Sequence, residues 1–222
     1  MTAPWTVLIP VKRPALAKSR LAVAPATRAA LARAFALDTI DAALQCAQVQ
    51  SVRVITADDE VTARASELGA TVVVDSTEGD LNQCLRDAAA PLPPSPLVAL
   101  VSDLPALRPH ELGSALIFAD HLLRVASRRS AGFLQDCTGN GTTLFAASAN
   151  SGFDPRFGML SAAAHRASGA RPLRTGGVDT VRRDVDTLRD LRAALLLGVG
   201  PHTARVCRAA EGWQLLETAH ST

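Results

Sequence analysis

The chain has 222 residues, enough to bury a hydrophobic core in one large domain or two small ones without disulfide staples. Its 23 basic and 21 acidic side chains nearly balance, which argues against a basic nucleic-acid sheath and against an acidic tail. Aromatic residues are scarce, with six Phe, two Trp and no Tyr, so a base-stacking platform for single-stranded nucleic acid is disfavoured.

The cysteines and the first residues bear on the compartment. Cys46, Cys84, Cys137 and Cys207 lie far apart and form no C-x-x-C pair, which indicates reduced thiols in a cytosol and no zinc or redox motif. No basic and apolar leader opens the chain, and no apolar run approaches the roughly 20 residues of a membrane span. We therefore expect a cytoplasmic protein without nucleic-acid or membrane partners.

Short apolar runs alternate with helical patterns along the chain. Helices are predicted at 27–47 with Thr27 as N-cap, then at 58–69, 81–90, 109–123, 162–167 and 188–197. Strands are predicted at 7–11, 51–56, 71–75, 97–101, 131–135 and 143–147, with a strand-like segment at 172–175. Strands that are apolar on both faces, each followed by a helix, predict an α/β fold. We expect a mostly parallel central sheet with helices on both faces. We expect one domain over 1–222, ending in a tail at about 211–222.

Ligands of such sheets bind beyond the carboxyl ends of the strands, so the segments that follow the strands are the candidate binding loops. After the first strand come four cations, Lys12, Arg13, Lys18 and Arg20. Positive charges at this position suit a polyphosphate, although a solvated basic loop explains them equally well. The loop is neither G-x-G-x-x-G nor a P-loop, which disfavours both of those nucleotide-binding folds.

Three carboxylates are also candidates for binding a metal ion. Asp103 comes directly after the fourth predicted strand, where it is a metal ligand or a helix cap. Asp184 and Asp186 lie two residues apart, so an extended backbone presents both carboxylates on one side. Two like charges this close favour a cation between them, and Mg²⁺ prefers oxygen ligands. The alternative is that Asp186 or Thr187 caps the following helix.

Two glycine-containing stretches, 139–143 and 156–161, suit an anion, because glycine lets backbone N–H groups approach it and a helix start attracts it. Thr142 and Ser161 add hydroxyl donors to these stretches, although ordinary turns explain each stretch alone. His165 is interpreted as a packing or surface residue and Cys137 as a spectator.

Taken in order, these motifs resemble one family from about Val7 to His202. The residues that carry the resemblance are Ile9-Pro10-Val11-Lys12, Ala17-Lys18-Ser19-Arg20-Leu21, Gly79-Asp80-Leu81-Asn82, Asp103-Leu104-Pro105, Gly141-Thr142, Arg156-Phe157-Gly158, Ser161, His165 and Asp184-Val185-Asp186-Thr187. The family is that of the 2-phospho-L-lactate/phosphoenolpyruvate guanylyltransferases of coenzyme F-420 biosynthesis, and the chain looks most like its actinobacterial branch.

The resemblance implies a compact nucleotidyltransferase fold, similar to that of the guanylyltransferases of molybdenum-cofactor synthesis. It implies transfer of GMP from GTP to phosphoenolpyruvate with Mg²⁺, giving enolpyruvyl-diphospho-guanosine and pyrophosphate. By matching positions, it implies metal carboxylates at Asp103, Asp184 and Asp186, which with Lys18 form the catalytic set. It further implies phosphoenolpyruvate contacts from Thr142, Gly158 and Ser161, GTP phosphate contacts from Lys12, Lys18 and Arg20, and Asn82 on the nucleoside side.

Other functions stay open at this point. The acceptor could be 2-phospho-L-lactate, 3-phosphoglycerate or a molybdopterin, and the Asp-x-Asp pair also suits a glycosyltransferase. A nucleotide-binding regulatory module without catalysis is a further alternative, and a homodimer stays open. The chain departs from the family pattern at Asp80, Cys137, Asn140 and Met159-Leu160, and the last three departures flank the expected acceptor pocket.

Overall fold

The computed structural model describes residues 4–12, 18–75, 77, 80–124, 130–149 and 152–209. The strands are β1 (Trp5–Val11), β2 (Val49–Thr56), β3 (Thr71–Val74), β4 (Leu97–Leu100), β5 (Ala131–Gln135), β6 (Thr142–Ala147) and β7 (Arg171–Pro172). The helices are α1 (Pro25–Leu44), α2 (Asp59–Leu68), α3 (Leu81–Ala89), α4 (Pro109–Arg124), α5 (Ser161–Ala167), α6 (Leu188–Leu197) and α7 (Pro201–Ala209), with a 3-10 turn at Asp179–Val181. The predicted tail lies outside the described residues.

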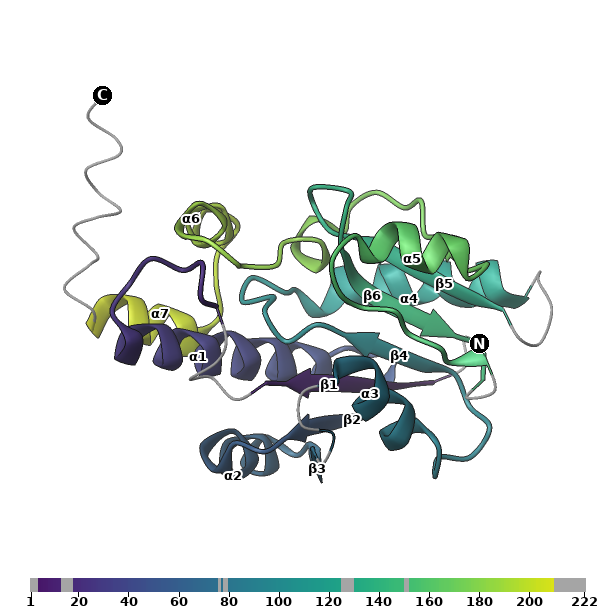
Figure 1. Cartoon of the computed structure of the whole chain (residues 1–222), viewed down its shortest axis with the longest axis horizontal. Coiled ribbons are helices and arrows are strands. Elements are labelled where there is room, and N and C mark those ends of the chain that lie inside the picture. Colours follow the sequence, from purple (N-terminus) through teal and green to yellow (C-terminus); the bar gives the residue numbers. More distant parts are fainter. Residues whose placement is uncertain are drawn as a thin grey trace.

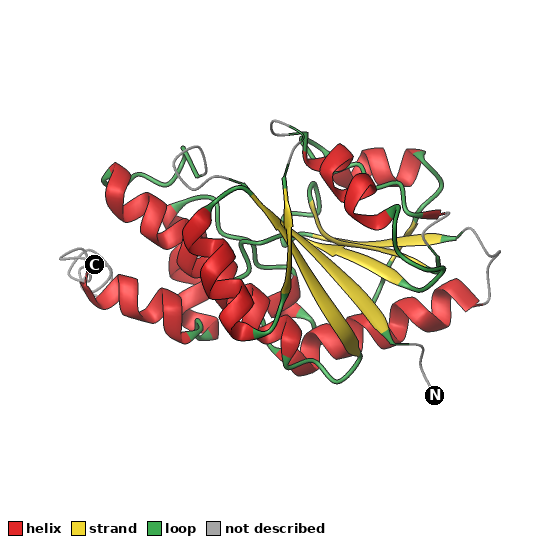
Figure 2. Ribbon diagram, turned by 90° about the horizontal axis from the view of Figure 1, so that it is seen from below, coloured by secondary structure: helices red, strands yellow, loops and turns green. Residues whose placement is uncertain are grey.

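The strands form one twisted sheet in the order β3-β2-β1-β4-β6-β5-β7, with helices on both faces (Figures 1 and 2). The pairs β1–β2, β1–β4, β2–β3 and β5–β7 are parallel, whereas β6 runs antiparallel to both β4 and β5. The prediction of a mostly parallel α/β sheet is therefore confirmed. The chain leaves β1 toward β2 on one side and returns as β4 on the other. The carboxyl ends of β1 and β4 thus meet at a topological switch point, where open α/β sheets bind ligands.

Strand β1 shows why its residues occupy the centre of the sheet. Val7, Ile9 and Val11 point into one core cluster with α1 and α4, and Leu8 points into a second cluster with α3 and α5. This period of two, apolar on both faces, is what a central strand covered by two helical layers requires. The pairing of β1 with β4 ends at Leu8, two residues before Pro10. The N–H that proline lacks is therefore not needed for a bond to β4.

A third core cluster joins the C-terminal helices to the start of α1. Phe35 of α1 and Leu191 of α6 belong to it. The buried Asp38 of α1 caps α7, because its carboxylate accepts hydrogen bonds from the backbone N–H groups of His202 (2.9 Å) and Thr203 (2.8 Å). A Cβ at position 200 would collide with this carboxylate, so Gly200 permits the close approach.

Several element boundaries differ from those expected. Helix α1 begins at Pro25 with Ala24 as its N-cap, so the prediction of Thr27 as the cap is wrong; proline with its fixed φ starts the helix instead. The strand-like segment at 172–175 is reduced to the two residues of β7, and α7 was not predicted. The helix predicted at 58–69 is confirmed as α2, with Asp58 as its N-cap and Gly69, at a φ of +100°, as its C-cap.

All four cysteines carry free thiols, and only Cys137 is exposed. Among the described residues, no helix is both long and apolar enough to pass through a lipid bilayer.

Replacing Asp38 by alanine tests the bond between α1 and α7. Because the substitution removes a charged cap and leaves two buried N–H groups without a partner, we expect Asp38→Ala to lower the free energy of unfolding by about 1–3 kcal/mol. Urea denaturation followed by circular dichroism measures the change. Asp41→Ala, on the same helix but with no helix cap to lose, is the matched control, and an equal loss in both variants would contradict the capping role.

Candidate active site

A pocket of about 830 Å³ opens at the switch point between β1 and β4. The segments that follow β1, β4 and β5 line it, together with the segment before α5 and residues 184–190. All of the predicted site residues line this pocket except Asn82, namely Lys12, Lys18, Arg20, Asp103, Thr142, Gly158, Ser161, Asp184 and Asp186. Arg13, a further predicted cation of the first loop, lies outside the described residues.

Hydrogen bonds and ion pairs bring Asp103 close to the Asp184–Asp186 segment, although more than 80 residues separate them in the sequence. The backbone N–H of Val185 donates to the carbonyl of Asp103 at 3.0 Å, which fixes the 184–186 segment beside the end of β4. Lys18 Nζ forms ion pairs with both Asp103 and Asp186, the latter at 2.8 Å. Arg20 contacts the other oxygen of Asp186 at 2.6 Å.

Thr39 anchors the loop that carries Asp103. The buried Thr39 hydroxyl donates to the Phe35 carbonyl at 2.8 Å and accepts the backbone N–H of Leu104 at 3.1 Å. The long helix α1 therefore holds the residue next to Asp103. Thr39 was missed in the sequence, although a threonine on a face that packs into the core is the kind of signal that marks such an anchor.

The charges of the pocket change the pKa of three of its residues, Asp184, Asp186 and Lys18. Burial, followed by the charges of Asp103, Asp136 and Asp186, raises the pKa of Asp184 to about 7. Burial acts in the same direction on Asp186, but the nearby Lys18 and Arg20 outweigh it and lower the pKa of that carboxyl. Burial acts to lower the pKa of Lys18, yet the charges of Asp103 and Asp186 raise it above its ordinary value, so Lys18 stays an ammonium ion.

The same carboxylates have features that suit a divalent cation. Oδ1 of Asp103 is buried and has no hydrogen-bond partner, and the raised pKa of Asp184 indicates an excess of negative charge. Carboxylate oxygens with unmet demand for positive charge suit Mg²⁺. In the part of the chain that the structure describes, however, no three His, Cys, Asp or Glu side chains are already grouped to hold a metal ion. The Lys18 ammonium lies between two of the predicted ligands instead.

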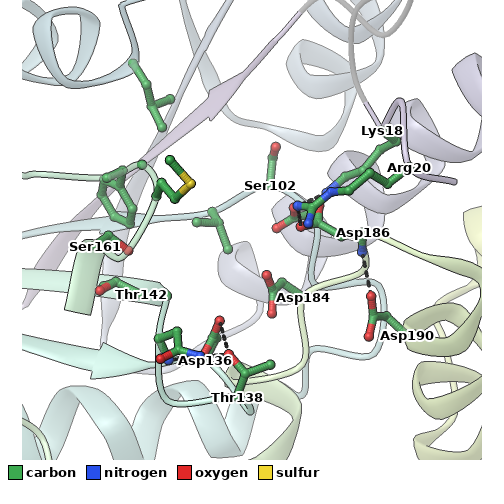
Figure 3. A pocket seen from close by; sticks show the side chains of 18 of the residues that line it. Lys18, Arg20, Ser102, Asp136, Thr138, Thr142, Ser161, Asp184, Asp186 and Asp190 are labelled. Atoms are coloured by element: carbon green, nitrogen blue, oxygen red, sulfur yellow. Dashed lines mark hydrogen bonds and ion pairs between the residues drawn. The ribbon is translucent and has the colours of Figure 1, made fainter. Parts of the chain in front are cut away.

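Figure 3 shows that the pocket has two chemically different sides. Lys18, Arg20 and Asp186 form the charged side, and the hydroxyls of Thr142 and Ser161 lie on the other, with Asp184 between them. Gly158 has a φ of +141°, and a Cβ there would meet no atom within 4 Å. Because L side chains rarely adopt this φ, glycine is required for the backbone and not for space.

Hydrogen bonds to two side chains hold the segment before α5. Asn82 Oδ1 accepts the N–H of Phe157 at 2.7 Å, and Asn82 Nδ2 donates to the Phe157 carbonyl at 2.9 Å. The amide of Asn82 is thus engaged with the loop on the hydroxyl side, while its neighbour Leu81 lines the pocket. The nucleoside role of Asn82 stays a prediction. Asp80, the departure from the family pattern, is the N-cap of α3 and accepts the N–H groups of Asn82 and Gln83.

His165 provides the second anchor of this segment. It is fully buried, and its Nε2 accepts the backbone N–H of Arg156 at 2.8 Å. Its Nδ1 lies 3.0 Å from the hydroxyl of Thr142. The packing interpretation of His165 therefore holds, but the sequence did not reveal that this histidine contacts a pocket residue.

Asp136 is a pocket residue that the sequence analysis did not single out. It follows β5, and its Oδ1 accepts the hydroxyl of Thr138 at 2.9 Å and the N–H of Asn140 at 3.1 Å, closing the turn into β6. A Cβ at Gly141 would collide with it. Its place after a predicted strand is the signal that could have found it.

Comparison with known proteins shows the family to which the chain belongs. The family described as "Guanylyl transferase CofC like" matches residues 5–209. The chain belongs to this family. A phosphoenolpyruvate guanylyltransferase of Streptomyces coelicolor is 48% identical over 208 residues, which cover 91% of this chain and 95% of that protein. The protein of the same name from Salinispora arenicola is 46% identical over 212 residues, covering 95% and 96%.

Solved structures with the same fold are much more distant in sequence. A nucleotidyl transferase from Methanothermobacter is 18% identical, with a TM-score of 0.59 over 87% of this chain and 97% of that one. A cytidylyltransferase from Leptospira borgpetersenii is 13% identical, with a TM-score of 0.57 over 96% of each chain. These structures show that the CofC-like chain has the nucleotidyltransferase fold that the resemblance implied.

The burial of His165 makes stability depend on pH. Burial lowers the pKa of His165 from 6.5 to about 4, so between these values the unfolded chain binds a proton that the folded chain does not. The stability that comes from burying a neutral imidazole is therefore complete above pH 6.5 and lost as the pH falls toward 4, by roughly 3 kcal/mol in all. We expect the difference in unfolding free energy between wild type and His165→Asn to shrink by about 2 kcal/mol, most of this amount, from pH 7 to pH 4.5 in urea titrations. A difference that is constant over this range would contradict the burial of a neutral ring.

Proposed function

We propose that the protein transfers GMP from GTP to phosphoenolpyruvate, giving enolpyruvyl-diphospho-guanosine and pyrophosphate in coenzyme F-420 biosynthesis. One observation carries the proposal: cationic side chains and two hydroxyl groups line opposite sides of a single pocket at the switch point, in a chain of the CofC-like family. This arrangement suits a reaction that joins two anions. The relatives named phosphoenolpyruvate guanylyltransferase support phosphoenolpyruvate as the acceptor.

In the proposed reaction, a phosphate oxygen of phosphoenolpyruvate attacks the α-phosphorus of GTP. A new P–O bond forms there, the bond from the α-phosphorus to the oxygen bridging to the β-phosphorus breaks, and the electron pair leaves with pyrophosphate. The acceptor phosphate has a second pKa of about 6 and is largely ionised at pH 7, so no general base is needed to activate it. No covalent enzyme intermediate is needed either.

The obstacle is repulsion between two anions, and the residues of the pocket divide the work. Lys18 and Arg20 bind phosphate oxygens of GTP and stabilise the charge that grows on pyrophosphate, with Lys12 at the entrance of the same loop. Thr142, the backbone at Gly158 and Ser161 orient the acceptor, so that attack occurs from a fixed position.

We propose Asp103, Asp184 and Asp186 as the residues that hold Mg²⁺. When bound, the metal supplies positive charge that neutralises phosphate oxygens on both reactants. The unpartnered Oδ1 of Asp103 and the raised pKa of Asp184 support this assignment. Because Lys18 pairs with Asp103 and Asp186 here, loading of the site requires its ammonium to exchange these carboxylates for phosphate oxygens.

A pyrophosphate-release assay tests the proposal. The purified protein is incubated with GTP and Mg²⁺ and with phosphoenolpyruvate, 2-phospho-L-lactate or 3-phosphoglycerate in turn. We expect phosphoenolpyruvate to give a kcat/KM at least tenfold above the other acids, with a nucleotide product of the expected mass. Preference for another acid would overturn the acceptor, and no turnover with any acid would favour a nucleotide-binding module.

Three further measurements use the same assay. Removal of divalent cations by EDTA should abolish turnover, and added Mg²⁺ should restore it. Asp184→Asn should lower kcat more than about 10³-fold, equivalent to roughly 4 kcal/mol of transition-state stabilisation, while circular dichroism shows an intact fold. Asp87→Asn, at an exposed position of α3, should retain full activity. Normal Mg²⁺ dependence in Asp184→Asn would refute the metal role.

Lys18→Ala tests the contact with GTP. Because the variant removes a buried ammonium and leaves two carboxylates beside the expected nucleotide phosphates, we expect kcat/KM for GTP to fall at least tenfold, or about 1.4 kcal/mol. Steady-state kinetics at saturating acceptor measure it. Arg64→Ala, which removes an exposed cation on α2, is the control, and an equal kcat/KM in both variants would count against Lys18.

A further inference from the structure

The surroundings of His165 determine which of its nitrogens carries the proton. The ring is fully buried and lies against three phenylalanines, with centroid distances of 5.6 Å to Phe133, 4.8 Å to Phe145 and 5.4 Å to Phe157. Burial in these apolar surroundings keeps the imidazole neutral, in agreement with its lowered pKa. A neutral imidazole has one N–H and one bare nitrogen.

The backbone of Arg156 selects between the two forms. Its N–H can only donate, and it points at Nε2 over 2.8 Å, so Nε2 is the bare nitrogen and the hydrogen is on Nδ1. The hydroxyl of Thr142, 3.0 Å from Nδ1, therefore accepts from His165 and cannot donate to it.

The direction of this bond decides where the Thr142 proton points. A threonine hydroxyl carries one hydrogen, and none of the described residues offers it another recorded acceptor. Thr142 lines the pocket beside Ser161 (Figure 3). Its O–H is thus available to an oxygen that enters the pocket, and an anionic oxygen, which can only accept, suits it best.

We propose that His165 is a positioning residue for the acceptor: by donating from Nδ1 to Thr142, it turns the Thr142 hydroxyl toward the pocket to bind an oxygen of the phosphorylated acid. The assignment of that oxygen to the acceptor rests on the proposed function. The direction of the His165–Thr142 bond does not, because it follows from the contacts of the protein alone. His165 also joins β6 to the loop before α5, so one side chain links the two segments that form the hydroxyl side of the pocket.

Two variants separate the two bonds of the ring. The amide of asparagine reaches the place of Nδ1, so His165→Asn keeps a donor toward Thr142. The amide of glutamine reaches the place of Nε2, so His165→Gln keeps an acceptor for Arg156 and loses the donor. We expect His165→Gln to raise KM for phosphoenolpyruvate at least tenfold with KM for GTP within about twofold, and His165→Asn to stay within threefold of wild type for both. His121→Gln, at an exposed position of α4, should match wild type.

A double-mutant cycle tests whether His165 acts through Thr142. In the background of Thr142→Val, which lacks the hydroxyl, His165→Gln should change the acceptor KM by less than twofold. Thr142→Ser, which keeps the hydroxyl, should restore the large effect. Multiplicative effects of Thr142→Val and His165→Gln, or equal KM changes in the asparagine and glutamine variants, would overturn the proposal.

Nitrogen-15 NMR of the histidine rings in the intact protein gives a readout that needs no turnover. The His165 ring, assigned by its absence in His165→Gln, should show a protonated Nδ1 and a bare Nε2 from pH 6 to pH 8. A hydrogen on Nε2, or on both nitrogens, would overturn the inference. If the wild-type protein does not react with GTP and any of the acids, the proposed function fails. The double-mutant cycle is then repeated with calorimetry, which measures the affinity of each variant for phosphoenolpyruvate. Absence of that binding, too, would overturn the role of His165.

Discussion

Repulsion between aspartates is the constraint around which the pocket is built. Asp103, Asp136 and Asp186 all act on Asp184 and, after burial itself, raise its pKa to about 7. Left to themselves, loops carrying these charges would separate. Main-chain contacts prevent this, because the bond from Val185 to the Asp103 carbonyl and the anchoring of Leu104 by Thr39 do not depend on charge. The fold thus holds the acids together, and cations are drawn to them.

Lys18 is the buried cation that the chain itself supplies, and the more exposed Arg20 lies beside Asp186. Lys18 forms ion pairs with Asp103 and Asp186, whereas its charge acts on Asp184 too weakly to offset the burial and the neighbouring acids that raise the pKa of that carboxyl. A residue held only by charge can exchange one anion for another at little cost, since each partner lost is replaced by a phosphate oxygen. This explains how one lysine can offset the pocket's own carboxylates and still bind a nucleotide in the proposed reaction.

The sequence predicts the sheet well because its strands are apolar on both faces, a pattern that few other arrangements satisfy. It also singles out Asp103, which follows a strand, and Asp184 and Asp186, whose spacing of two puts both carboxylates on one side of an extended segment. The direction of β6 was within reach, because a connection as short as the one between β5 and β6 cannot make a parallel crossover. Helix α7 was not, since its position depends on Asp38, which lies 164 residues from His202. The contact of His165 with Thr142 could not be predicted either. Nothing in the local sequence distinguishes a histidine that faces Thr142 from one that faces solvent.

His165 makes two hydrogen bonds that an apolar residue in its place could not make. Three phenylalanines surround the ring, so a fourth aromatic hydrocarbon would pack there. It would leave the N–H of Arg156 without its partner and the hydroxyl of Thr142 without its donor, at about 1–3 kcal/mol for each buried group left unsatisfied. Asn82 does the same for both backbone groups of Phe157. Neutral hydrogen bonds with fixed directions therefore hold the hydroxyl side of the pocket, whereas exchangeable ion pairs hold the charged side. A pocket built in this way can orient a small acid rigidly while its charged side adjusts to a nucleotide that arrives with its own anions.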